Sequence, residues 1–116
     1  MTKSFVMGNL TRDPDYRTTA SGKPVCDLCV AANDFKQNDV SFIDVTVFGN
    51  QAEHCRHHLE KGSKVLVEGH LKQDRFEDKD GRKRSRLYVI ADGVTFLDSK
   101  RQESGRPEYD QPPRNY

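Results

Sequence analysis

The sequence predicts a small all-β domain with a single helix. Two observations carry this prediction. Segments in which apolar and polar residues alternate recur along the chain as far as residue 97, and such alternation is typical of half-buried strands. One segment, after the third predicted strand, instead repeats its apolar residues at helical spacing. At 116 residues the chain has room for one small core and no second domain.

The first half of the chain contains three predicted strands, the first of them in two parts. The interruption in the first strand falls at Pro14, which cannot donate to a β-ladder. A turn cluster at residues 21–24 closes a hairpin, and a polar connection follows at 37–39. The three strands are predicted at residues 3–10 with 15–19, 25–36 and 41–48.

A helix is predicted after the third strand. Asn50 is placed to cap its first turn, and Glu53 three residues later completes a capping-box-like pair. Gly62 marks the end of the helical segment. The apolar stripe that would seal one end of a barrel consists of Ala52, Cys55 and Leu59.

The last two strands, predicted at 63–76 and 84–97, form a long hairpin around a Gly-containing turn. Between Lys72 and Arg86, basic residues outnumber acidic ones. Five strands with one helix between the third and fourth give the element order of the OB-fold, a five-stranded Greek-key barrel. In that fold the loop joining strands 4 and 5 is one of the loops that grip the ligand.

Four phenylalanines fall on the polar faces of these strands. In the third strand the odd positions are apolar, which places Phe42 and Phe48 on the opposite face. The same alternation places Phe35 on the face of Cys29, and it places Phe76 on a polar face unless a bulge shifts it by one residue. The residues assigned to the inward face are Leu28, Val30, Ala32, Ile43, Val45, Val47, Val65, Val67 and Leu71.

Aromatic rings on a polar, partly basic sheet surface suit stacking on unpaired bases, because every base has a π-face and Lys or Arg can neutralise the phosphates between them. The alternative is that the rings pack against another subunit or against the C-terminal segment.

The chain also resembles the bacterial single-stranded DNA-binding protein (SSB) family. The resemblance covers roughly residues 2 to 97 in a consistent order. It rests on motifs that are weak singly and specific together: Gly8-Asn9-Leu10-Thr11-Arg12-Asp13-Pro14, Phe42 to Phe48 followed by Gly49, Glu60-Lys61-Gly62-Ser63, Val67-Glu68-Gly69 and Asp80-Gly81.

The resemblance implies a homotetrameric OB-fold core around which single-stranded DNA wraps. The family's aromatic positions fall on Phe35, Phe42, Phe48 and Phe76. The expected function is sequence-tolerant, non-catalytic coating of unpaired strands in replication, recombination and repair. The residues expected to contact phosphates are Lys3, Arg12, Lys61, Lys72, Arg75, Arg82, Lys83 and Arg84. Relatives often carry basic residues where this chain has Asp44, Asn50 and Asp74, so fewer phosphate contacts are expected.

Other functions are compatible with parts of the sequence. The same phenylalanine face would serve an RNA-binding module or a primosome-type accessory protein. An enzyme would need the His/Cys-rich helix to hold a metal, but His54 and His58 have no paired acid in HExxH order. Cys26 and Cys29 have zinc-knuckle spacing but would point to opposite faces of a strand. We therefore expect neither a metal nor a cofactor.

Composition and the chain termini complete these expectations. The net charge of +1 gives no nucleic-acid signal by itself. No secretion signal or membrane span is visible, which predicts a cytoplasmic, nucleoid-associated protein. We expect one domain over residues 1–98 and a disordered polar tail over 99–116. In the resembled family an acidic, apolar tail tip recruits replication and repair enzymes. The ending Pro-Pro-Arg-Asn-Tyr lacks this tip, which suggests an accessory member or a chain without its end.

Overall fold

The computed structural model describes residues 1–34, 36 and 39–97. Phe35 and the expected tail, residues 99–116, therefore lie outside the described residues. The order of elements confirms the predicted arrangement, except that the two parts of the first strand are separate strands. The elements are β1 (Ser4–Leu10), β2 (Asp15–Thr18), β3 (Pro24–Asp34), β4 (Asp39–Phe48), α1 (Asn50–His58), β5 (Lys64–Glu77) and β6 (Lys83–Phe96).

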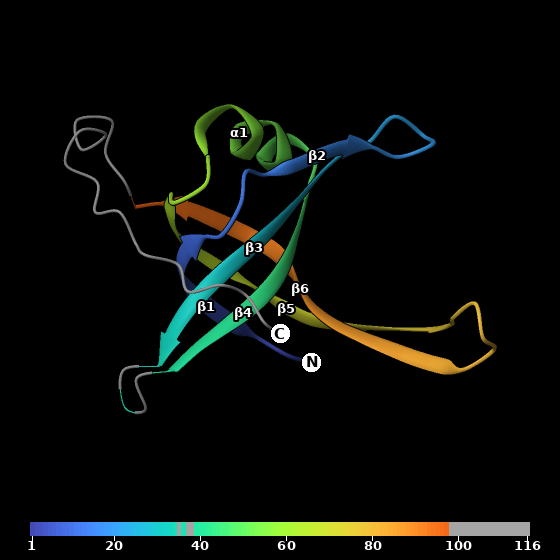
Figure 1. The fold of residues 1–116 in the computed structure, drawn as a ribbon. Helices are drawn as coiled ribbons and strands as arrows, with labels where there is room; N and C mark the ends of the chain where they lie inside the picture. Colours follow the sequence, from blue (N-terminus) through green and yellow to red (C-terminus); the bar gives the residue numbers. More distant parts are fainter. Residues whose placement is uncertain (35, 37–38, 98–116) are drawn as a thin grey trace.

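The strands form one sheet that closes on itself. Its order is β1-β5-β6-β4-β3-β2, and an additional pairing of β1 with β3 completes the barrel. Neighbouring strands are antiparallel except β4 and β6, whose short ladder is parallel. Gly8 permits the closure, because a Cβ atom there would lie 2.0 Å from the carbonyl oxygen of Ala31 on β3. The barrel with α1 above it is visible in Figure 1.

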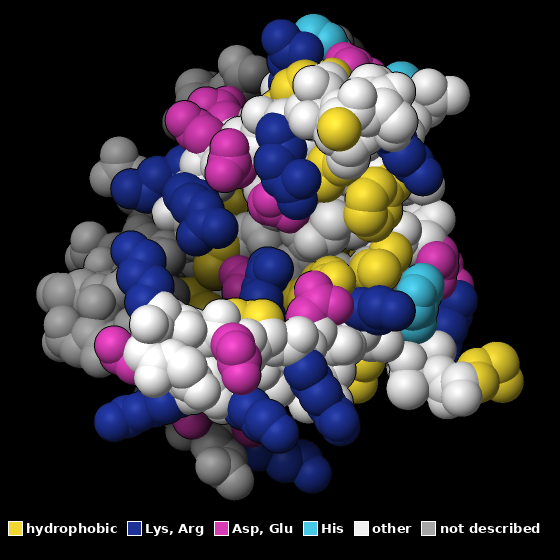
Figure 2. Space-filling model, turned by 90° about the vertical axis from the view of Figure 1, so that its right-hand side faces the viewer, with side chains coloured by type: hydrophobic (Ala, Val, Ile, Leu, Met, Phe, Trp, Pro, Cys, Tyr) yellow, Lys and Arg dark blue, Asp and Glu magenta, His cyan; other side chains and the backbone are white. Residues whose placement is uncertain are grey.

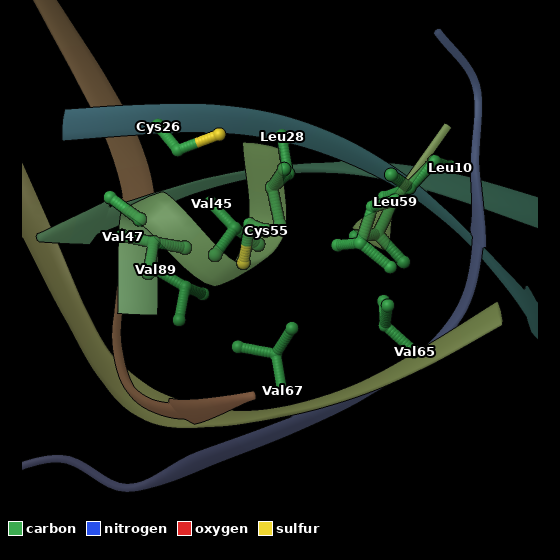
Figure 3. Close-up of a cluster of buried hydrophobic side chains, with 12 residues drawn as sticks. Leu10, Cys26, Leu28, Val45, Val47, Cys55, Leu59, Val65, Val67 and Val89 are labelled. Atoms are coloured by element: carbon green, nitrogen blue, oxygen red, sulfur yellow. The ribbon is translucent and has the colours of Figure 1, made fainter. Parts of the chain in front are cut away.

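Apolar side chains from β1, β3, β4, β5, β6 and α1 fill the barrel (Figure 3). The predicted inward residues of β4 are confirmed, since Val45 and Val47 are almost fully buried and Ile43 packs against the same cluster. The buried cluster comprises Leu10, Cys26, Leu28, Val30, Val45, Val47, Ala52, Cys55, Leu59, Val65, Val67 and Val89.

The helix α1 packs against β2, β3 and β4 at one end of the barrel and buries its predicted stripe. The expected capping box is wrong. The residue at the helix N-cap is Gly49, with φ 73°, and no side chain caps the first turn. A glycine reaches this left-handed conformation without the steric cost that a side chain imposes. Glu53 instead accepts a hydrogen bond from the Tyr16 hydroxyl of β2.

Beyond the barrel, β5 and β6 continue as a long paired arm, seen at the lower right of Figure 1. A β-bulge interrupts their register at Glu68/Gly69. Leu71 lies on the inward side as predicted, opposite the buried Val89, but it is 42% exposed and does not join the core. Leu71 lies where the arm leaves the barrel, so no opposing layer covers it. Within the described ranges, no helix is long and apolar enough to cross a membrane.

Candidate nucleic-acid interface

The outer face of β4 carries two of the predicted phenylalanines. Phe42 is half-buried, and Phe48 is 38% exposed at the end of the strand. The register pairs Phe42 with Ala31 and Phe48 with Val25 on β3. Because directly paired residues share a face of the sheet, the predicted separation of these rings from the inward valines is confirmed.

The same face continues onto the β5–β6 arm. Thr46 of β4 and Ile90 of β6 are partners in the parallel ladder, so alternate β6 residues from Ile90 back to Arg84 lie on the face of Phe42 and Phe48. Phe76 lies opposite Arg84 on this face and is 50% exposed. We call this surface the aromatic face; its members are Phe42, Asp44, Thr46, Phe48, His70, Lys72, Asp74, Phe76, Arg84, Arg86, Tyr88 and Ile90.

Tyr88 is an aromatic residue of this face that the sequence analysis missed. Its hydroxyl donates a hydrogen bond to Asp74 Oδ2 over 3.1 Å. Burial, together with the neighbouring Asp74 carboxylate, raises the pKa of Tyr88 above its usual value. The guanidinium carbon of Arg86 lies 4.6 Å from the centre of the Tyr88 ring. Alternation against the buried Val89 would have revealed its position, had tyrosine been considered beside phenylalanine.

A polar network holds the centre of the sheet beside these rings. Asp27 of β3 accepts hydrogen bonds from the Thr46 hydroxyl on one oxygen and from Arg17 Nε on the other, both over 3.1 Å. This pairing leaves Asp27 compensated rather than free to repel an anionic ligand. Cys29, expected on the polar face, lies opposite Asp44 on that face but is only 4% exposed.

Several cations accompany the aromatic rings. Lys72 lies opposite Tyr88, and Lys23 places its ammonium 5.1 Å from the centre of the Phe48 ring. Arg84 is already engaged, because its Nε donates to Asp78 Oδ2 over 2.8 Å. That contact, with backbone N–H groups of the turn, lowers the pKa of Asp78. The aromatic face is therefore accompanied by Lys72 on the arm, by Lys23 beside Phe48, and by Arg84, which is committed to the turn of the arm.

The other predicted cations lie away from the aromatic face. Arg75 and Lys83 alternate onto the opposite side of the arm, and Arg82 belongs to the turn. The ammonium of Lys3 forms a 2.7 Å ion pair with Glu68. The loops carrying Arg12 and Lys61 meet at another part of the barrel, where the Lys61 backbone N–H donates to Asp13. The structure thus divides the predicted phosphate contacts among separate surfaces.

The arm is hollowed around the exposed phenylalanine. Side chains from both faces of the hairpin line this hollow. The lining residues are Arg75, Phe76, Glu77, Lys83, Arg84 and Ser85. Figure 2 views the molecule from the side of the arm and shows hydrophobic side chains open to solvent between the arm and the body of the barrel, with Lys and Arg around them. An extended, anionic ligand with flat apolar groups matches this surface.

The candidate metal ligands do not form a site in the described part of the chain, where no group of three or more His, Cys, Asp or Glu is placed to hold an ion. His54 and His58 stack on each other along α1, with ring centres 6.1 Å apart. Cys26 and Cys55 are buried in the core, and burial raises the pKa of Cys26 to about 11 and that of Cys55 to about 12. These thiols are therefore protonated near neutral pH.

Fold and surface together define an OB-fold protein with an aromatic and cationic outer face. Over residues 1–97 the sequence matches the Single-strand binding protein family, and the chain belongs to this family. It is 42% identical over 105 residues to the single-stranded DNA-binding protein of Helicobacter hepaticus, an alignment covering 84% of this chain and 62% of the relative.

Two further relatives have related names. The single-stranded DNA-binding protein of Wolinella succinogenes is 40% identical over 110 residues, covering 89% of this chain and 68% of the relative. Single-stranded DNA-binding protein 1 of Staphylococcus aureus strain MSSA476 is 34% identical over 113 residues, covering 93% and 72% respectively. The chain thus spans between about three fifths and three quarters of the length of these relatives.

Proposed function

We propose that this protein binds single-stranded DNA without catalysis and with little sequence preference. The observation that carries the proposal is the placement of Phe42, Phe48 and Phe76 on one outer face of an OB barrel. Membership of the Single-strand binding protein family supports it, and three relatives bear the name single-stranded DNA-binding protein. A double helix hides the faces of its bases, so this surface favours an unpaired strand.

In this proposal the strand runs along the aromatic face. Bases stack on Phe42, Phe48 and Phe76, and Phe35 is proposed as a fourth stacking residue from the sequence alone. Lys72 and Lys23 neutralise phosphates beside these rings. The remaining cations of the arm add to the local positive potential, and Arg84 joins them when a phosphate competes with the Asp78 carboxylate for its guanidinium.

We further propose that the protein is a homo-oligomer, a tetramer by its family resemblance. Two observations support association through β1. Its Ser4–Gly8 segment pairs with β5 on one edge, while the register places only Asn9 and Leu10 against β3 on the other. On its outer face Phe5 is 67% exposed and Met7 is 47% exposed. A second copy paired at this edge would cover both the open backbone groups and the apolar side chains.

The cellular task that follows is the coating and protection of strands that are transiently unpaired in replication, recombination and repair, at the nucleoid in the cytoplasm. The comparisons do not favour the alternative of an accessory module that uses the face for another partner. Comparison of oligo-dT with oligo-rU at matched salt measures the preference for DNA over RNA.

The direct test is binding of fluorescein-labelled oligo-dT followed by anisotropy, with a duplex of equal length as competitor. We expect tight binding of the single strand. The logarithm of its binding constant should fall linearly with the logarithm of the salt concentration. Equal affinity for the single strand and the duplex would contradict the proposal. Both ligands present phosphates, so equal affinity would indicate binding through phosphates alone, without stacking on bases.

A further inference from the structure

We propose that Tyr88, covered by Arg86, forms an additional base-binding position in the middle of the aromatic face. The inference rests on the proposed binding of single-stranded DNA and adds to it a specific contact. The ligand at this position is a single unpaired nucleobase together with the phosphate next to it.

Its location separates this position from the other rings. Tyr88 lies four residues from Arg84, the cross-strand partner of Phe76, which corresponds to about 13 Å along β6. In the other direction it lies two residues from Ile90, the partner of Thr46. A base stacked on Phe76 therefore cannot also cover Tyr88. Among the described β6 residues of this face from Arg84 to Ile90, Tyr88 supplies the aromatic ring.

The contact with Arg86 shows that the Tyr88 ring can receive a flat cationic or aromatic group. A guanidinium is planar, and its carbon lies 4.6 Å from the ring centre. Within the described residues, Arg86 forms no ion pair, so its displacement breaks only the contact with the ring. We infer that a base takes the place of the guanidinium and that Arg86 moves to the adjoining phosphate.

Asp74 serves as the positioning residue. Its Oδ2 accepts a hydrogen bond from the Tyr88 hydroxyl over 3.1 Å, across the same face of the arm. This hydrogen bond fixes the hydroxyl end of the Tyr88 side chain and limits movement of the ring before the ligand binds. The arrangement also explains an acidic residue on a surface that binds an anion: the carboxylate is partly occupied by a donor of the protein itself.

The experiment uses Tyr88→Trp in the full chain, which contains no other tryptophan. Its indole emission is recorded during titration with oligo-dT, while the anisotropy of the labelled oligonucleotide reports binding independently. Stacking of a base on residue 88 predicts quenching that saturates together with the anisotropy. The matched control is Leu87→Trp, because Leu87 is the neighbouring residue on the opposite side of the arm and is 61% exposed. Its emission should change little.

Two further variants complete the test. Tyr88→Leu keeps apolar bulk but removes the ring, and should weaken oligo-dT binding on the order of tenfold. Arg86→Gln should lower the log–log salt slope by about one, as expected for one lost phosphate contact.

Normal oligo-dT binding with unquenched Tyr88→Trp, or undiminished affinity in Tyr88→Leu, would overturn the inference and leave the proposed function intact. Failure of the unmodified protein to bind oligo-dT overturns both. If Tyr88→Trp does not fold, the affinity of Tyr88→Leu decides.

Discussion

Thr46 of β4 and Ile90 of β6 are partners in the short parallel ladder of the barrel. Through this pair, the outer face that carries Phe42 and Phe48 becomes continuous with the arm that carries Phe76. Along the chain, β4 and β6 are separated by α1 and β5.

Alanine at Phe42 and at Val45 should have different effects. Val45 is 1% exposed in the core, so Val45→Ala should lower the free energy of unfolding by about 1 to 3 kcal/mol through lost burial and a cavity. Phe42→Ala should instead weaken oligo-dT binding by about 1 to 3 kcal/mol, with a smaller loss of stability. Paired thermal melts and oligo-dT titrations measure both quantities. Equal melting losses with normal DNA binding would assign Phe42 to a packing role.

Two cations of the arm, Lys72 and Arg75, should contribute unequally to DNA binding. Lys72 lies on the aromatic face opposite Tyr88, whereas Arg75 lies on the other side opposite Ser85. Lys72→Ala should weaken oligo-dT binding and reduce the salt slope by about one, because it removes a phosphate contact. Arg75→Ala should have the smaller effect. Titrations at four salt concentrations decide this, and a larger slope change for Arg75 would place the DNA around the edge of the arm.

The buried thiols make stability depend on alkaline pH. Burial raises the pKa of Cys26 to about 11 and of Cys55 to about 12, from a usual value of 9.0. Above pH 9 the unfolded chain loses thiol protons that the folded chain retains, so the free energy of unfolding should fall as pH rises from 9 toward 12. Chemical denaturation across this range tests the prediction. The variant Cys26→Ala, compared with the parent, should show a shallower decline.

Asp78 orders the turn of the arm. Its Oδ1 accepts the backbone N–H groups of Asp80 and Arg82, each over 2.9 Å, while Oδ2 binds Arg84. Since the folded-state pKa of Asp78 is lowered, its contribution should be complete above the ordinary carboxyl pKa and lost as pH falls through the lowered value. Hydrogen exchange of the turn amides should therefore accelerate in Asp78→Ala at neutral pH. Protection equal to that of the parent would show that the backbone alone sets the turn.

The sequence predicted the barrel strands well because their residues are buried on one side only. Alternation assigned Val45 and Val47 inward and Phe42 and Phe48 outward, and the structure agrees. Alternation also assigned Leu71 to the side of the buried Val89, but Leu71 is exposed, because alternation records which side a residue faces and not whether another layer covers it.

Other features depend on information that a local pattern lacks. The N-cap prediction chose Asn50 from its hydrogen-bonding side chain, but the chain enters the helix through Gly49 at positive φ. Asp78 and Arg84 were too far apart in sequence to be recognised as a pair before the turn was known. The division of predicted cations among different surfaces likewise required the β5–β6 register.

The most direct test of the aromatic face compares Phe76→Ala with Leu87→Ala. Both side chains are at least half-exposed and lie on opposite sides of the same arm, so neither truncation should unfold the barrel. The measurement is oligo-dT affinity at one fixed salt concentration, with thermal melts as a folding control. We predict that Phe76→Ala loses about 1 to 3 kcal/mol of binding free energy and that Leu87→Ala binds like the parent. Unchanged binding in Phe76→Ala, or an equal loss in both variants, would contradict the account.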